Sequence, residues 1–168
     1  MDRPQVTPGN WPGLDDLVES FDHFAIAVDA IESALPMVTG LGGTFHQGAD
    51  HVRNRFRWIQ FRLPGGACLE LLQPLGGGSF LNRFLETRGE GLHHITFRVR
   101  DIEQAQARFS HTGLVTTGLH LHPDWSEVFV HPKSGHGVLI QLAAWPESEN
   151  WRGYTLEDVM SGRSVDDT

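Results

Sequence analysis

The segments DHFAIAVDAIESALPMV (residues 22–38) and HHITFRVRDIEQAQARF (residues 93–109) decide the fold of this chain. They align without a gap when one is shifted along the chain so that His23 falls on His94. The same shift places Glu70 on Gln141. Repetition at one constant offset indicates two copies of one structural unit. Four further pairs are identical at this offset: Val28 and Val99, Ile31 and Ile102, Glu32 and Glu103, and Ala34 and Ala105.

Each copy has the pattern of a strand, a helix and three further strands. Short apolar runs indicate the strands, and glycine follows each helix at its carboxyl end. The sequence therefore predicts an α+β fold, in which two tandem βαβββ modules form an open, curved mixed sheet, a cup with its helices on the outside. The expected elements of the first copy are a strand at 24–28, a helix at 30–38 and strands at 44–47, 55–63 and 67–72. Those of the second copy are a strand at 95–99, a helix at 102–111 and strands at 114–121, 127–131 and 137–142.

The repeat also sets the predicted domain boundaries. An extended arm covers residues 1–20, and the repeated domain covers residues 21–145, with modules at 21–75 and 92–145. The linker between the modules contains a short helical stretch at 80–86. Residues 146–168 form an acidic C-terminal tail, with a short helix expected at 155–160.

Four polar residues are predicted to face the inside of the cup. Side chains alternate across a strand, and the bulky apolar face of each strand is expected to cover a helix. His23, Glu70, His94 and Gln141 then fall on the opposite face and converge near the centre. A lone histidine there is more often a hydrogen-bonded polar group of the sheet. Two histidines and a Glu/Gln pair at one offset instead predict a shared centre.

Two imidazoles, a carboxylate and an amide oxygen form a mixed nitrogen and oxygen site. Such a donor set suits one divalent ion, Zn²⁺, Co²⁺, Ni²⁺, Mn²⁺ or Fe²⁺. Four protein ligands would leave two positions of an octahedron open, which is enough for a chelating substrate.

Composition excludes several classes of function. The net charge of −8 without a basic stripe argues against nucleic-acid binding. The apolar runs are too short to span a bilayer. Cys68 is the only cysteine, which excludes an internal disulfide and suits a reducing compartment. We therefore expect a cytoplasmic protein that acts on a small molecule, not on nucleic acid or a membrane.

Several longer segments resemble one known group of enzymes. They are LELLQPL (residues 69–75), FLETRGEGLHHITFRV (residues 84–99) and HPKSGHGVLIQL (residues 131–142), together with the Asp22-His23 pair. On these segments the chain resembles the vicinal oxygen chelate (glyoxalase/bleomycin resistance/dioxygenase) superfamily, and within it the methylmalonyl-CoA epimerases. The resemblance implies metal ligands at His23, Glu70, His94 and Gln141, an acyl-CoA substrate whose α-carbon loses a proton, and a homodimer.

The chain departs from the epimerase pattern where the bases are expected. Position 141 is usually glutamate in that family, whereas Gln141 cannot accept a proton. The family also has a carboxylate on the third strand of the first module, and residues 55–62 contain none. The remaining acid/base candidates are Glu70, Glu127 and His131. Glu127 is equally explained as an exposed carboxylate at a strand end, and His131 as a support of the HPKSG hairpin.

Other residues of the predicted cup would contact the substrate. The shift of the repeat, applied to Phe56, Trp58 and Gln60, gives Glu127, Phe129 and His131 as their equivalents. Lys133 could meet a CoA phosphate, although a solvated hairpin lysine explains it as well. The residues predicted to bind substrate are Trp58, Gln60, Phe129 and Lys133.

The sequence thus favours a divalent-metal-dependent isomerase or epimerase-like enzyme, or a lyase, that lacks the usual bases of its family. Two alternatives stay open. His23, His94 and Glu70 also make the two-histidine, one-carboxylate set of an Fe(II) dioxygenase. A non-catalytic protein on the same fold could instead bind a small molecule in the cup.

Overall fold

The computed structural model describes residues 16–146 and 153–166. The elements of the first half are β1 (Val18–Ala27), α1 (Ile31–Gly40), β2 (Thr44–His51), β3 (Phe56–Arg62), β4 (Cys68–Pro74) and α2 (Phe80–Arg88). Those of the second half are β5 (Gly91–Val99), α3 (Ile102–His111), β6 (Thr116–His120), β7 (Ser126–Val130), β8 (Leu139–Ala144), α4 (Leu156–Met160) and β9 (Val165–Asp166). No helix in these two ranges is long and apolar enough to cross a membrane.

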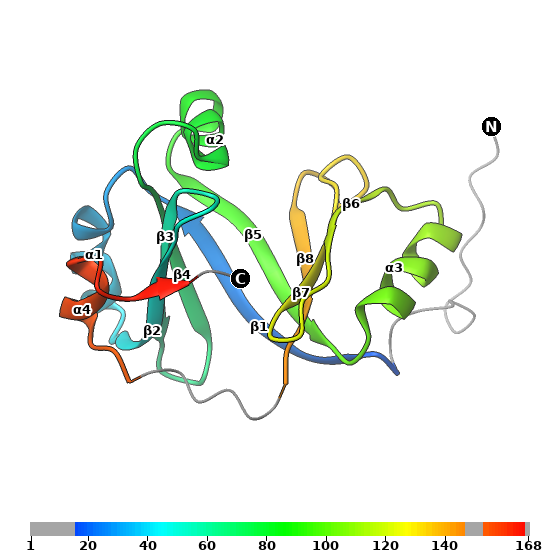
Figure 1. Ribbon diagram of the computed structural model, residues 1–168, viewed down its shortest axis with the longest axis horizontal. Helices are drawn as coiled ribbons and strands as arrows, with labels where there is room; N and C mark the ends of the chain where they lie inside the picture. The colour runs from blue at the N-terminus through cyan, green and yellow to red at the C-terminus, as the bar shows by residue number, and fades with distance from the viewer. Residues whose placement is uncertain (1–15, 147–152, 167–168) are drawn as a thin grey trace.

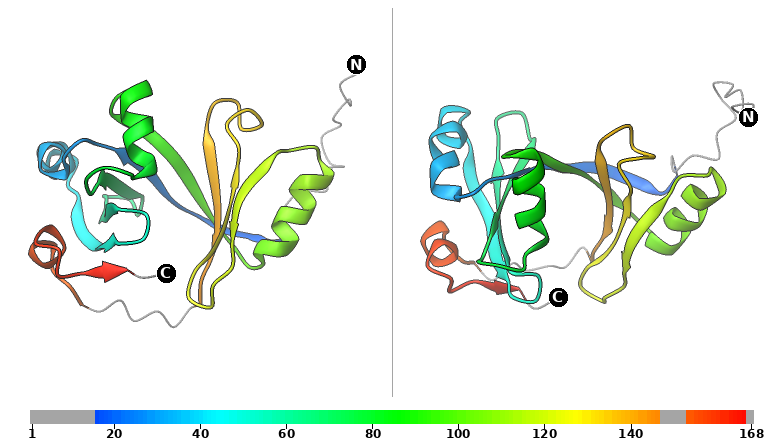
Figure 2. Two further views of the ribbon diagram at one scale, coloured as in Figure 1. Left: turned by 45° about the horizontal axis from the view of Figure 1, so that its top comes forward. Right: turned by 90° about the horizontal axis from the view of Figure 1, so that it is seen from above.

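The strands form one sheet in the order β6-β7-β8-β5-β1-β4-β3-β2-β9. Without β9, the order is symmetric about its centre. Each strand of the first half has a counterpart at the same distance from the centre: β1 corresponds to β5, β4 to β8, β3 to β7 and β2 to β6. A pseudo-twofold axis therefore passes between β1 and β5, which pair antiparallel, while β1–β4 and β5–β8 pair parallel. The predicted pair of βαβββ modules in an open mixed sheet is confirmed. Figures 1 and 2 show the strands β4, β3 and β2 on one side of the β1–β5 pair and β8, β7 and β6 on the other; we call these two sides the walls.

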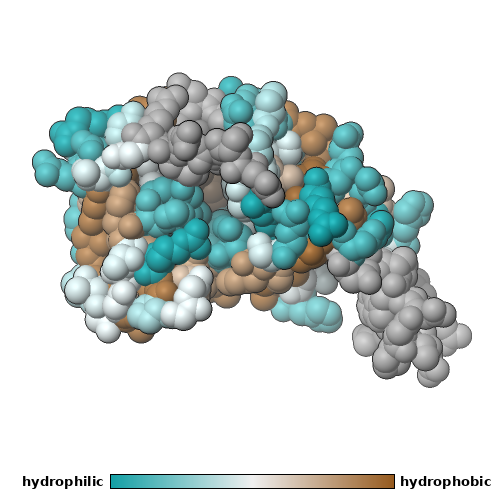
Figure 3. Space-filling view, turned by 90° about the horizontal axis from the view of Figure 1, so that it is seen from below, coloured by the Kyte–Doolittle hydropathy of each residue, from teal (hydrophilic) through white to brown (hydrophobic). Residues whose placement is uncertain are grey.

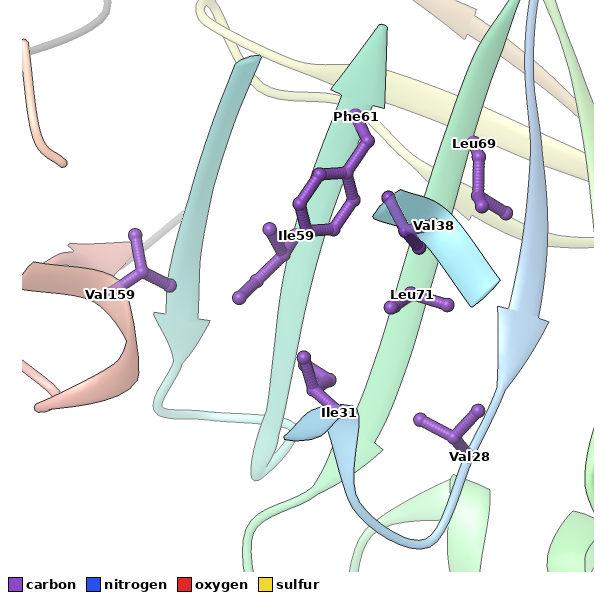
Figure 4. Close-up of a cluster of buried hydrophobic side chains, with 8 residues drawn as sticks. All are labelled: Val28, Ile31, Val38, Ile59, Phe61, Leu69, Leu71 and Val159. Carbon is purple, nitrogen blue, oxygen red and sulfur yellow. The ribbon is translucent and has the colours of Figure 1, made fainter. Parts of the chain in front are cut away.

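The apolar face of each wall packs against helices on the outside. In the first half, Ile59 and Leu71 pack with Ile31 and Val38 of α1, as Figure 4 shows. In the second half, Val99, Val128 and Leu142 pack with Ile102 and Ala105 of α3. This packing leaves the alternate side chains of the same strands on the inner face.

The strand β1 is longer than the sequence predicted. It begins at Val18, within the segment expected to be an extended arm, and Leu17 is already buried. Irregular register between Val18 and Ser20 and between Phe21 and His23 breaks the alternation of side chains, which hides the strand from a periodicity argument. The rest of the predicted arm, residues 1–15, lies outside the described residues.

Part of the predicted acidic tail returns to the sheet. The short helix expected at 155–160 is confirmed as α4, with Thr155 as its N-cap in a capping box. Val159 of α4 joins the core of the first module, and β9 pairs with β2. Arg57 fixes this contact from β3: its Nη1 donates to the carbonyl of Met160, and its Nε and Nη2 donate to Asp50 at 2.6 and 3.0 Å.

We expect Arg57→Met to lower the free energy of unfolding by roughly 2–4 kcal/mol, because it leaves the nearly buried Asp50 carboxylate without its partner. Arg163→Met is the matched control, since the ion pairs of Arg163 are exposed and worth about 0–1 kcal/mol. Urea unfolding measures both. Equal losses in the two variants would show that Arg57 does not anchor the C-terminal segment.

Candidate functional site

The register of the sheet brings five polar side chains together at the centre of the cup. His23 of β1, Thr96 of β5 and Gln141 of β8 are neighbours across three adjacent strands. In the next row, Glu70 of β4 and His94 of β5 flank the same residue of β1. All five side chains are nearly inaccessible to solvent.

Three of these residues form a group that could hold a metal ion, His23, Glu70 and His94, whose ligand atoms all lie within 4.8 Å of one another. Nε2 of His23 lies 3.3 Å from Nε2 of His94 and 3.2 Å from Oε2 of Glu70. The distance from Nε2 of His94 to the same Glu70 oxygen is 3.9 Å. Two imidazole nitrogens and one carboxylate oxygen thus converge, as a mixed-donor divalent site requires.

The outward nitrogens of both imidazoles are held by their own neighbours. Oδ2 of Asp22 lies 2.7 Å from Nδ1 of His23, and Nδ1 of His93 lies 2.9 Å from Nδ1 of His94. A bond at Nδ1 fixes the orientation of the ring and leaves Nε2 for a metal ion. This second layer of contacts is a further reason why the three residues fit a metal ion.

The titration of the two histidines differs because their surroundings differ. Burial lowers the pKa of His23, but the carboxylates of Glu70 and Asp22 outweigh it and raise this pKa to about 9. Burial dominates at His94 and lowers its pKa to about 3. Burial would raise the pKa of Glu70, whereas the charge of His23 and its hydrogen bond hold it below the ordinary value. Without a metal ion, the group therefore carries a protonated His23 beside an ionised Glu70.

Gln141, the predicted fourth ligand, links this group to Glu127. Its Oε1 accepts a 2.6 Å hydrogen bond from Thr96, whose hydroxyl also lies 3.0 Å from Nε2 of His23. Its Nε2 donates a 2.6 Å hydrogen bond to Oε2 of Glu127. The indole of Trp125 donates to the same oxygen at 3.0 Å. Ligation by Gln141 stays a prediction.

A pocket of about 590 Å³ opens above these residues, between the two walls. Figure 3 shows the molecule hollowed between its two halves. Most of the pocket surface is apolar, although the majority of its lining residues are polar or charged, among them His51, Arg53 and His120. The pocket residues that the sequence had predicted for the site are His23, Trp58, Gln60, Glu70, His94, Glu127, Phe129 and Gln141.

The structure does not bring His131 and Lys133 into this pocket. Nδ1 of His131 accepts a hydrogen bond from the backbone N–H of Lys133, so the imidazole supports the hairpin. The reason is a change of offset within the repeat. Gln60 pairs with Glu70, and Phe129 pairs with Gln141, so the equivalent of Gln60 is Phe129 and not His131.

The offset changes because the two hairpins differ in length. Residues 63–67 connect β3 to β4, whereas residues 131–138 connect β7 to β8. The equivalent of Trp58 is therefore Glu127, not Phe129. A shift by two residues keeps the predicted face of β7 but moves each side chain along the strand.

Three site residues were given no contact of their own from the sequence: Asp22, His93 and Thr96. Asp22 and His93 directly precede the predicted ligands His23 and His94, and this adjacency is a signal that the sequence contains. Thr96 lies two residues after His94 and therefore on the same face of the strand, but the sequence gives it no partner. The contact of Trp125 with Glu127 depends on the turn between β6 and β7, which no sequence pattern specifies.

Comparisons with known proteins found a matching family profile, similar sequences and similar solved structures. The family profile described as the glyoxalase/bleomycin resistance protein/dioxygenase superfamily matches residues 22–125. The ethylmalonyl-CoA/methylmalonyl-CoA epimerase of Cereibacter sphaeroides is 33% identical over 135 residues, covering 75% of this chain and 98% of that protein. The human mitochondrial methylmalonyl-CoA epimerase is 30% identical over 145 residues, covering 82% and 78%. The crystal structure of methylmalonyl-CoA epimerase from Mycobacterium tuberculosis superposes with a TM-score of 0.69 at 27% identity, covering 77% and 90%.

We expect one divalent ion to bind per chain and to displace about one proton at neutral pH. Ligation needs an unprotonated nitrogen, and His23, with its pKa of about 9, must lose a proton while His94 is already neutral. The number of protons released should fall toward zero as the pH rises above 9. Calorimetric titration with Zn²⁺ or Co²⁺ in buffers of different ionisation enthalpy measures it.

The matched variants for this titration are His94→Ala and His111→Ala, the latter on the exposed surface of α3. His94→Ala should weaken binding by more than about 100-fold, since even second-layer partners of a ligand are worth about 10–100-fold. His111→Ala should bind like the parent. Parent-like binding by His94→Ala would show that the ion binds elsewhere.

Proposed function

This chain belongs to the glyoxalase/bleomycin resistance protein/dioxygenase superfamily, and from that membership we propose that it is a divalent-metal-dependent, epimerase-like isomerase. Its substrate would be a small-molecule thioester, such as an acyl-CoA, that loses a proton from the carbon next to a carbonyl. Relatives named as epimerases of methylmalonyl-CoA and ethylmalonyl-CoA support this substrate class. The observation that carries the proposal is the carboxylate of Glu127, held in the pocket beside the His23, Glu70 and His94 group.

The residues of this group have distinct tasks. A divalent ion bound by His23, Glu70 and His94 would supply the positive charge that makes the α-proton of a chelated carbonyl compound more acidic. Asp22 and His93 hold the two imidazoles in place. Gln60 positions Glu70, because its Nε2 donates to Oε1 of that carboxylate at 3.4 Å.

Glu127 is the base in this proposal. Gln141 and Trp125 both donate to its Oε2, so Oε1 takes part in neither bond and can accept a proton. Glutamine at position 141 suits this arrangement, because a glutamate there would bring two negative charges within hydrogen-bond distance. The base would thus have moved from β8 to the adjacent strand β7. His131, outside the pocket, receives no such role.

The walls of the pocket would hold the rest of the substrate. Trp58 and Phe129 exclude water from the reacting centre, which strengthens the electrostatic interactions there. Lys133 would reach a phosphate only on a substrate that extends beyond the pocket.

We also propose that the chain is a homodimer that uses the edge of its sheet. The edge strand β6 and its flanks expose Val115, Leu119 and Leu121 at 56%, 44% and 53%. An uncovered edge with apolar side chains favours pairing with another chain. Sedimentation at about 50 μM should give a dimer, and Leu119→Glu should give a monomer. A monomeric parent would contradict this assignment.

The proposed reaction predicts metal-dependent exchange of the α-proton of methylmalonyl-CoA with solvent deuterium. Glu127→Gln should slow the exchange by about 10²–10⁴-fold, the usual loss when a general base is removed. Glutamine can still accept the bonds from Gln141 and Trp125, so the fold and the metal content should not change. Glu103→Gln, on the exposed surface of α3, is the control. Mass spectrometry at matched metal content measures the rates.

Two results would lead to other functions. Oxygen consumption with Fe²⁺ and an aromatic substrate, without proton exchange, would favour the dioxygenase alternative. Tight binding of metal and thioester with neither reaction would favour a binding protein. Undiminished exchange in Glu127→Gln would keep the isomerase but transfer the role of base to another residue.

A further inference from the structure

The two walls of the pocket differ in their chemistry, although the fold relates them by a pseudo-twofold axis. His23 and His94 occupy equivalent positions of the repeat, so the metal-binding group lies on this axis, between the walls. Trp58 on β3 and Glu127 on β7 are equivalent positions. Trp58 lies two residues before Gln60, which pairs with Glu70, and Glu127 lies two residues before Phe129, which pairs with Gln141. A bound substrate thus meets a carboxylate on one side and an indole on the other.

Apart from Glu70, which belongs to the metal-binding group, the described residues of the first module's wall offer no carboxylate to the pocket. Trp58 is only 8% exposed and packs in an apolar cluster with Leu72 and Leu81. The oxygen of the Gln60 amide accepts a bond from Gln47, and amides do not act as bases at neutral pH. His51 stacks on Phe56 and has both ring nitrogens in contact with Asn54. His93 packs against Phe80 and Phe84 of α2, and its Nδ1 lies 2.9 Å from Nδ1 of His94.

The wall of the second module carries the acid/base groups. Glu127 lies on β7 with its Oε2 fixed by two donors. His120 of β6 pairs directly with Glu127 across the strands and also lines the pocket. Epimerisation with two bases needs one proton acceptor on each face of the α-carbon. Among the described residues, Glu127 on the second wall is the one pocket carboxylate that lies outside the metal-binding group.

We propose that this site moves protons on one face of the substrate's α-carbon only. It therefore exchanges an α-proton with retention of configuration. Such a site suits an isomerisation that uses one face of an enolate better than it suits inversion. This inference rests on the proposed function. Glu127 takes the α-proton, and the electron pair of the C–H bond becomes part of the enolate. The protonated carboxyl exchanges with solvent and returns a proton to the same face, which regenerates the C–H bond and the carboxylate.

The test uses (2R)- and (2S)-methylmalonyl-CoA as separate probes, with metal-loaded protein in deuterated water. Deuterium at the α-carbon and the configuration of that carbon are followed together, after subtraction of the uncatalysed reaction. We expect one epimer to gain deuterium with retention, and inversion to be slower by about 10²-fold or more, because one general acid/base is missing. Inversion as fast as exchange would overturn this inference but not the proposed isomerase. Exchange of neither epimer would overturn both.

A pair of variants at position 58 tests the cause of retention. Trp58→His supplies a proton acceptor at the equivalent of Glu127, whereas Trp58→Phe keeps an apolar ring. The ratio of inversion to exchange should rise by about tenfold or more in Trp58→His only. An equal rise in both variants would mean that bulk, not the missing base, controls the outcome. If neither variant folds, the stereochemistry of the parent decides.

Discussion

The antiparallel pairing of β1 with β5 is the contact on which the site depends. It joins the two modules and places His23 of one beside the strand that carries His94 of the other. Glu70 then reaches the same point from β4, because β4 pairs parallel with β1. Buried imidazoles and a carboxylate are costly to desolvate, so each has to be held by a partner. Asp22, His93, Thr96 and Gln60 supply these contacts, and they also aim the ligand atoms inward.

Duplication explains the arrangement of the site, and divergence explains its chemistry. The pseudo-twofold axis gives each functional position a counterpart, and the chain fills the counterparts differently: Glu70 with Gln141, and Glu127 with Trp58. The amide of Gln141 accepts from Thr96 and donates to Glu127, which a carboxylate could not do. An amide at this one position therefore allows a carboxylate on the adjacent strand, and it makes the two walls unequal.

The sequence predicted correctly on which face of a strand each side chain lies, but it predicted less well which position along the strand a residue occupies. Leu69 and Leu71 pack outward and Glu70 inward as predicted, because alternation along a strand is a local property. The predicted equivalence of Phe129 with Trp58 was wrong by two residues. The prediction assumed one constant offset along the whole repeat, and the longer β7–β8 hairpin changes that offset on β7. The position of α4 was predicted from its local pattern, but its packing was not, since Arg57 reaches Met160, and Val159 reaches the core, only in the folded chain.

The sequence by itself determined the two modules, the inner face of each strand, and the convergence of His23, Glu70 and His94. These follow from a constant offset and from the alternation of side chains, and both are properties of neighbouring residues. Only the tertiary structure decided that Asp22 and His93 hold the ligands, that Gln141 and Trp125 hold Glu127, and that His131 remains in its hairpin. These contacts join residues on different strands or across a turn, and their distances are set by strand register and loop length, which a periodic pattern does not encode.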